Sequence, residues 1–135
     1  MKRLIYIMLS LLLMAGCAPK VLSNGYKQIS MNEAVEMMSE ETDYIILDVR
    51  TKAEYEEKHI PDAICIPNED IGTEPPDALI DKEQLIFVYC RSGNRSKKAS
   101  QKLADMGYTN IMEFGGINDW QGEVARPKAQ ILTML

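Results

Sequence analysis

The stretch LIFVYCRSGNRS, residues 85–96, decides the fold of this chain of 135 residues. Its first five residues form an uninterrupted apolar run, which is typical of a strand buried on both faces of a sheet. The polar residues that follow Cys90 lead into a segment where Ala99, Leu103 and Met106 recur at helical spacing. The stretch therefore predicts a buried strand, a short loop that begins at Cys90, and an amphipathic helix.

Shorter patterns on both sides extend this arrangement. Capping-box spacing at Ser30 and at Thr51 predicts that a helix begins at each position, the second covering about residues 52–58. Apolar runs predict further strands at 44–47, 63–66 and 111–114. Strands that alternate with helices need crossover connections, so we expect an α/β fold with a mostly parallel sheet and helices on both faces. In such sheets ligands bind at the carboxyl ends of strands, where Cys90 lies.

Composition narrows the possible functions. Hydrophobic residues make up 46% of the chain and charged residues 26%, which indicates a packed core, and the length suits one domain. The net charge is −5 and no long run of Lys or Arg occurs, so nucleic acid is not expected as a partner. His59 is the only histidine, which excludes a multi-histidine metal site and a Ser-His-Asp triad. We therefore expect neither a metal nor another cofactor.

The first residues resemble an export signal. Lys2 and Arg3 precede an apolar run over residues 4–15, and Cys17 follows. The run is shorter than the stretch that a membrane-spanning helix needs. Residues 13–17, LMAGC, resemble the bacterial lipobox, in which the signal is cut just before a lipidated cysteine. We expect a signal peptide at 1–16, a tether lipidated on Cys17 at 17–25, a domain at 26–124 and a C-terminal tail at 125–135. The protein would then be anchored to a membrane in the cell envelope, outside the cytoplasm; an ordinary signal peptide with an incidental cysteine is the alternative.

The surroundings of Cys90 are those of a reactive thiol. A loop between a strand and a helix turns backbone N–H groups inward, and the start of the helix adds a partial positive charge. Arg91 and Arg95 add full positive charges. A thiolate is favoured in such a place, so we expect the pKa of Cys90 to lie below that of a free thiol.

Four separate stretches of this chain resemble the rhodanese family: LDVR at 47–50, HIPDA at 59–63, the loop CRSGNRS at 90–96, and FGGINDW at 114–120. They occur in the same order and together span nearly all of the chain after the signal. The resemblance implies the three-layer rhodanese fold in its single-domain form, with a central, mostly parallel sheet of five strands between helices.

The resemblance also implies an activity and a site. Cys90 would take the outer sulfur of a small sulfur-containing anion such as thiosulfate, hold it as a persulfide, and pass it to cyanide or a thiol. The persulfide would be bound by loop residues, and three residues outside the loop would support it. The loop residues are Arg91, Ser92, Gly93, Asn94, Arg95 and Ser96, and the supporting residues are Asp48, Arg50 and His59. Many thiosulfate-using relatives have a lysine at the position of Ser92, so the cellular donor stays open.

Two other functions are compatible with parts of the sequence. A rhodanese-like module of the envelope could bind a protein partner or relay thiol oxidation, with Cys65 either packed in the core or forming a disulfide with Cys90. A phosphatase or arsenate reductase could use the same architecture. Four residues separate Cys90 from Arg95, whereas the related phosphatases have one more, and this spacing favours sulfur chemistry.

Overall fold

The computed structural model describes residues 25–127. The predicted signal peptide, Cys17, nearly all of the tether and the end of the tail lie outside these residues. The described elements, in chain order, are β1 (Lys27–Gln28), α1 (Met31–Glu40), β2 (Tyr44–Asp48), α2 (Lys52–Glu57), β3 (Ile64–Cys65), a 3-10 turn (Asn68–Asp70), β4 (Leu85–Cys90), α3 (Asn94–Asp105), β5 (Ile111–Gly116) and a second 3-10 turn (Ile117–Asp119).

The five strands form one sheet in the order β1-β5-β4-β2-β3, and all neighbouring pairs are parallel. This confirms the predicted α/β fold with a five-stranded sheet. β4 lies at the centre, and all six of its residues are buried, as its continuous apolar run predicts. The most apolar strand is therefore the one that carries Cys90 at its carboxyl end.

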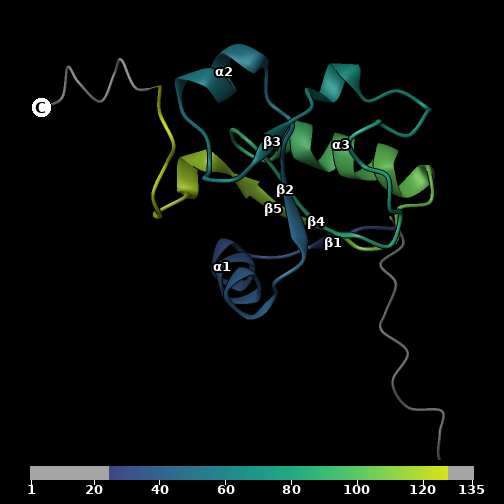
Figure 1. Ribbon diagram of the computed structural model, residues 1–135, viewed down its shortest axis with the longest axis horizontal. Helices are drawn as coiled ribbons and strands as arrows, with labels where there is room; N and C mark the ends of the chain where they lie inside the picture. The colour runs from purple at the N-terminus through teal and green to yellow at the C-terminus, as the bar shows by residue number, and fades with distance from the viewer. Residues whose placement is uncertain (1–24, 128–135) are drawn as a thin grey trace, which may run out of the picture.

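Helices cover both faces of the sheet (Figure 1). On one face, Ala99 and Leu103 of α3 pack against Val88, and Cys90 belongs to the same buried cluster. On the other face, Ala34 of α1 packs in a second cluster with β4 and β5. Both predicted capping boxes are present, since Ser30 and Thr51 each accept a hydrogen bond from the backbone of the third helical residue.

The sequence patterns missed or overextended the edges of the sheet. β1 has only two residues, Lys27 and Gln28, both exposed, so it has no apolar pattern; its pairing with β5 is a tertiary effect. β3 is shorter than the predicted strand at 63–66 because only Ile64 and Cys65 pair with β2. Hydrophobic patterns report burial, and edge strands bury little.

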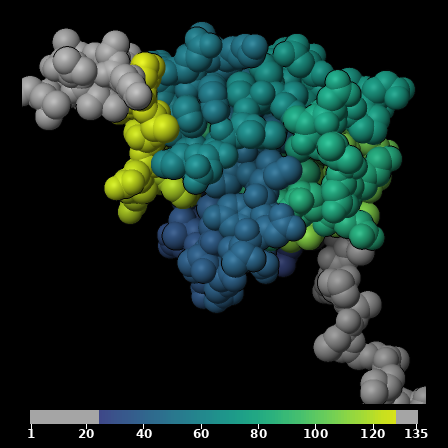
Figure 2. Space-filling view, viewed as in Figure 1, coloured from purple at the N-terminus to yellow at the C-terminus, as the bar shows by residue number. Residues whose placement is uncertain are grey.

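The end of the described chain returns to the domain. His59 and Ala125 exchange two backbone hydrogen bonds as an isolated antiparallel bridge. In Figure 2 the yellow residues near 125 lie against the segment that contains α2. Pairing therefore extends one residue past the predicted domain boundary at 124. No helix within residues 25–127 has the length and apolar character needed to cross a membrane.

Candidate active site

Strand β4 delivers Cys90 to the start of helix α3. Val88 and Cys90 belong to the cluster on the α3 face, and Tyr89 between them packs on the opposite face. Successive side chains of a strand point to opposite faces, so the Cys90 thiol lies beneath the first turn of α3. Cys90 is only 1% exposed. Its thiol is therefore surrounded by protein groups, and their chemistry decides its reactivity.

The loop turns its amides toward the sulfur. The Gly93 amide donates a hydrogen bond of 3.0 Å to Cys90 Sγ. Gly93 has a φ of 111°, in the left-handed region that favours glycine, and directly precedes α3. The predicted cradle of backbone donors is thus present at Gly93, on the one residue type that adopts this conformation without strain.

The pairing between β4 and β5 changes register just before the loop that follows Cys90. Val88 pairs with Glu113, but Cys90 pairs with Gly116, so β5 has one more residue than β4 between these pairs. Gly115 lies in this extra length and has a φ of 94°. An additional residue bends a strand and redirects its end. Here it directs the end of β5 under the loop that follows Cys90.

Gly116 lies directly against the loop backbone. A Cβ atom on this residue would lie 2.0 Å from the carbonyl oxygen of Arg91 and 2.5 Å from the amide nitrogen of Ser92. The same loop segment is held by the Asn118 amide, which donates to the Arg91 carbonyl over 3.2 Å. Only glycine fits at position 116, where the end of β5 passes directly against the loop.

Glu113 is a site residue that sequence reasoning missed. It is 3% exposed, and its carboxylate accepts hydrogen bonds from the Ser96 hydroxyl over 2.6 Å and the Gly115 amide over 2.9 Å. The Ser96 oxygen is in turn 3.4 Å from Cys90 Sγ. An acid within the apolar run of a buried strand was the available signal, because burying a carboxylate is costly unless polar partners surround it.

The polar contacts lower the pKa of Cys90. Burial acts in the opposite direction, because it disfavours the charged thiolate. Hydrogen bonds from the amides of Ser96, Gly93 and Ser92, and from the Ser96 hydroxyl when its proton is turned toward the sulfur, outweigh burial and favour the thiolate. The expected direction of the shift is therefore present, and its source is mainly neutral hydrogen-bond donors of the loop.

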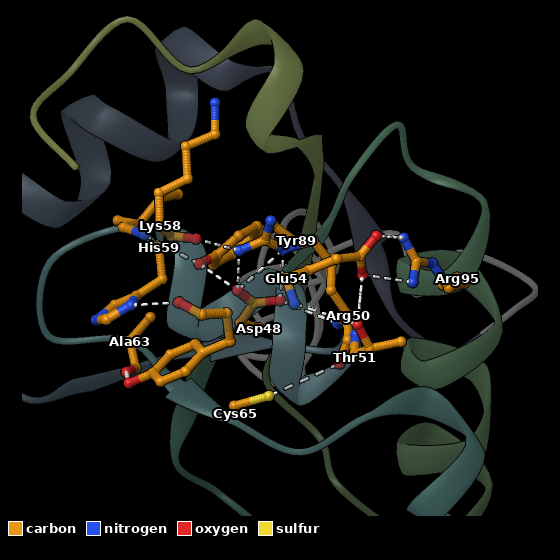
Figure 3. Close-up of polar contacts among 12 residues, drawn as sticks. Asp48, Arg50, Thr51, Glu54, Lys58, His59, Ala63, Cys65, Tyr89 and Arg95 are labelled. Carbon is orange, nitrogen blue, oxygen red and sulfur yellow. Dashed lines mark hydrogen bonds and ion pairs between the residues drawn. The ribbon is translucent and has the colours of Figure 1, made fainter. Parts of the chain in front are cut away.

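Asp48 and Arg50 form a buried ion pair at the end of β2 (Figure 3). The Asp48 carboxylate accepts from the guanidinium at 2.7 Å and from the Tyr89 hydroxyl at 2.8 Å. Arg50 also donates to the Lys58 carbonyl, and Tyr89 accepts from the Ile60 amide. These contacts connect β2 and β4 to the segment after α2.

The remaining loop side chains point outward. Arg95 donates to Glu54 of α2 at 2.8 and 3.2 Å, and this contact, together with hydrogen bonds from Thr51, lowers the pKa of Glu54 to about 2 despite an opposing effect of burial. Arg91, Ser92 and Asn94 are exposed. Arg95 therefore fastens the loop to α2 through its side chain.

A small pocket of about 200 Å³ lies beside the loop. Its lining includes both charge signs: Arg50, Glu54, Glu57, Lys58 and Arg91, together with Ile117 and Asn118. A larger pocket of about 640 Å³ lies between α1 and residues 119–122, and no loop residue lines it. Of these two pockets, the smaller one has a lining that includes the loop residue Arg91.

His59 makes its contacts with Tyr55, away from the groups that surround the Cys90 thiol. The His59 ring stacks on Tyr55 with 3.8 Å between ring centroids, and its Nδ1 lies 2.9 Å from the Tyr55 carbonyl oxygen. Figure 3 shows His59 and Arg95 on opposite sides of the Asp48 network.

Cys65 and Tyr89 both pair with Asp48, one from each side of β2. They are thus two strand spacings apart, about 10 Å. Disulfides need Cα atoms within about 7 Å, so Cys65 does not reach the neighbouring Cys90 without movement of the backbone. Burial raises the pKa of Cys65 to about 11, which further disfavours its thiolate.

Trp120 lies at the edge of the fold. Its ring packs 6.4 Å from the ring of Phe114, and its Nε1 donates to the Glu123 carbonyl. It also lines the larger pocket. Trp120 is therefore partly buried against the second core cluster.

Comparison with known proteins identifies the family. The model of the rhodanese-like domain matches residues 30–123. Thiosulfate sulfurtransferase PspE of Escherichia coli is 34% identical over 84 residues, which are 62% of this chain and 77% of that protein. Thiosulfate sulfurtransferase GlpE of Coxiella burnetii is 35% identical over 97 residues, 71% of this chain and 88% of that protein. Adenylyltransferase and sulfurtransferase UBA4 of Meyerozyma guilliermondii is 38% identical, but the match covers only 21% of its length.

Solved structures agree with this result. A rhodanese-like domain protein from Staphylococcus aureus superimposes with a TM-score of 0.63 at 28% identity and covers 76% of this chain and 99% of that one. A structure described as rhodanese with anions from E. coli gives a TM-score of 0.57 at 31% identity and covers 62% of this chain and 99% of that one.

Proposed function

Because the chain belongs to the rhodanese-like domain family, we propose that it is a sulfurtransferase that carries a sulfane sulfur on Cys90. The observation that carries the proposal is the hydrogen bond of 3.0 Å from the Gly93 amide to Cys90 Sγ, at the start of a twelve-residue helix. Relatives named thiosulfate sulfurtransferase support the same reaction class.

The reaction would proceed in two displacements. The Cys90 thiolate attacks the outer sulfur of the donor, a new S–S bond forms, and the donor's bond to that sulfur breaks with its electron pair on the leaving group. An acceptor thiolate or cyanide then attacks the terminal sulfur and regenerates the Cys90 thiolate. Preorganised amides stabilise the negative sulfur in both steps without reorganisation at the moment of reaction. Arg91, Ser92, Gly93, Asn94, Arg95 and Ser96 form the binding loop in this proposal, and Asp48, Arg50 and His59 support it.

The pocket beside the loop suits a small anionic donor. Arg91 and Lys58 line it, and the charges of two other lining residues, Arg50 and Glu54, are already paired with Asp48 and with Arg95. An anion that enters would meet two cations against the single remaining carboxylate of Glu57. We propose that the donor is a small sulfur-containing anion, of which thiosulfate is the one to test first.

The test combines turnover with detection of the intermediate. The purified protein is incubated with thiosulfate and cyanide, and thiocyanate is measured. The Cys90→Ser variant should lose this activity and keep its unfolding midpoint, whereas Cys65→Ser should keep the activity. Thiosulfate alone should add the mass of one sulfur atom to the wild type and to Cys65→Ser only. Absence of both thiocyanate and the sulfur adduct in the wild type contradicts the proposal.

We also propose that the protein acts at the cell envelope, anchored by a lipid on Cys17. The support is the sequence alone: two basic residues, a short apolar run and the LMAGC motif at 13–17. Mass spectrometry of the protein from its native membrane should find a chain that begins at Cys17 and carries a lipid. A chain that begins at another residue, or an unmodified Cys17, contradicts this location.

A further inference from the structure

The hydroxyl of Ser96 lies between the Glu113 carboxylate and the Cys90 sulfur, and each can accept its hydrogen. It has one hydrogen to donate, and its oxygen is 2.6 Å from Glu113 Oε1 and 3.4 Å from Cys90 Sγ. The carbonyls of Gly93 at 2.9 Å and Gly115 at 3.3 Å are further acceptors. A hydroxyl that donates to the carboxylate presents its lone pairs to the sulfur, so it can accept from a thiol but cannot donate to a thiolate.

Two negative charges are therefore disfavoured in this place at the same time. With Glu113 ionised, the shortest contact takes the Ser96 proton, and Cys90 is best accommodated as the neutral thiol. With Glu113 protonated, the carboxyl donates to Ser96, and Ser96 is free to donate to a thiolate. Like charges separated by a single hydroxyl in a buried site do not ionise independently.

The geometry points to Glu113 as the group that holds the proton of Cys90, through Ser96, while the sulfur is a thiolate. This inference rests on the proposed function of Cys90 and adds a positioning residue to the same site. The Cys90 thiol proton moves to Ser96 Oγ as the Ser96 proton moves to Glu113 Oε1. No net charge and no oxidation state change, and the thiolate is made without removing a proton to bulk water. The proton stays on Glu113 while the thiolate attacks the donor sulfur.

The surroundings of Glu113 favour a neutral, protonated carboxyl group beside a Cys90 thiolate. On the neighbouring strands its register partners are Val88 of β4 and Gln28 of β1, which are uncharged. Within the described residues, the hydrogen bonds to its carboxylate come from Ser96 and Gly115 only. The loop and the first turns of α3 contribute only cations, and these are exposed or, for Arg95, paired with Glu54: Arg91, Arg95, Lys97 and Lys98.

The inference is tested on the resting protein, without any sulfur donor. Thiolate absorbance of Cys90 is followed against pH as the difference between the protein and its Cys90→Ser variant, each with Glu113 or with Glu113→Gln. Shared protons predict two titration steps for Cys90 with Glu113 present and a single step in Glu113→Gln. The exposed Glu83 provides a matched control, because Glu83→Gln removes the same charge from the surface and should leave both steps unchanged.

Infrared spectroscopy gives a second readout that does not depend on the Glu113 variant folding. The wild type should show the carbonyl stretch of a protonated carboxylic acid in the pH range between the two steps. Cys90→Ser should lose this band, because a serine at this position does not supply the proton. A role of Glu113 in packing alone would not produce a carboxylic acid band that depends on Cys90.

A single titration step in the wild type that Glu113→Gln leaves unchanged, or a carboxylic acid band that is absent or persists in Cys90→Ser, overturns the inference. Neither measurement requires sulfur transfer. Absence of both thiocyanate and the sulfur adduct, with two coupled steps, would reject the proposed function alone. Thiocyanate formation with a single uncoupled step would reject only the role of Glu113.

Discussion

The carboxyl ends of β2 and β4 lie side by side, and both carry buried polar groups, yet they differ in how their charges are satisfied. At the end of β2, the carboxylate of Asp48 faces the guanidinium of Arg50, and full charges cancel. At the end of β4, the sulfur of Cys90 faces neutral donors of the loop and the Ser96 hydroxyl. A charge cancelled by a partner is fixed in place, whereas one stabilised by neutral donors stays available as a nucleophile.

The largest effect on stability is expected at the β2 end. Asp48→Asn removes the charge that compensates buried Arg50, and breaking a buried pair in this way costs about 3–5 kcal/mol. Urea unfolding measures the loss. Asp119 is exposed, and Asp119→Asn serves as the control, with a stability close to that of the wild type. A loss from Asp48→Asn as small as that of a surface pair, about 1 kcal/mol or less, would remove the contrast between the two ends.

A smaller effect on stability, with a large effect on reactivity, is expected beneath the β4 loop. Gly116→Ala places a methyl group 2.0 Å from the Arg91 carbonyl oxygen, so the loop must shift. Overpacking of this kind costs about 1–3 kcal/mol. Alkylation of Cys90 should slow because the amides no longer converge on the sulfur. Gly72→Ala is the matched control, since a Cβ there meets nothing within 4 Å. Equal alkylation rates in the two variants would show that the loop geometry does not govern the thiol.

The thiols of Cys90 and Cys65 should react with an alkylating reagent in different pH ranges. Hydrogen bonds lower the pKa of Cys90, whereas burial and the charge of Asp48 raise that of Cys65 to about 11. Iodoacetamide should therefore modify Cys90 at a lower pH than Cys65, which peptide mass mapping of the folded protein can follow. If Cys65 were modified before Cys90 at neutral pH, the loop amides would not favour the Cys90 thiolate.

The smallest effect is expected where Arg95 joins the loop to α2. Glu54→Gln removes a partly exposed pair and should cost about 0.2–1 kcal/mol near neutral pH. The folded-state pKa of Glu54 is about 2, below its usual 4.5, so the contribution is complete above the unfolded value. It should disappear as the pH falls from about 4.5 toward 2. Urea unfolding of both proteins across this range checks the sign; a difference that grows on acidification would contradict it.

Much of this fold follows from local patterns. Capping boxes at Ser30 and Thr51 begin helices where expected, and the apolar run 85–89 is the central strand. These features depend on contacts within a few residues or on burial along one element, which the order of residues contains. The position of Cys90 between a buried strand and the start of a helix was predictable in the same way, because the apolar run and the helical spacing on either side of it are local patterns.

The sequence by itself determined the order of the strands and α-helices from α1 to β5, the loop around Cys90 and the family resemblance, because each depends on neighbouring residues or on short motifs. Only the tertiary structure decided the pairing of β1, the partner of Arg95 and the place of Glu113 beside Ser96. Ser96 and Glu113 are separated along the chain by a helix and a turn. A parallel crossover brings them together, and hydrogen-bond distances between such segments depend on packing and register that no local pattern records.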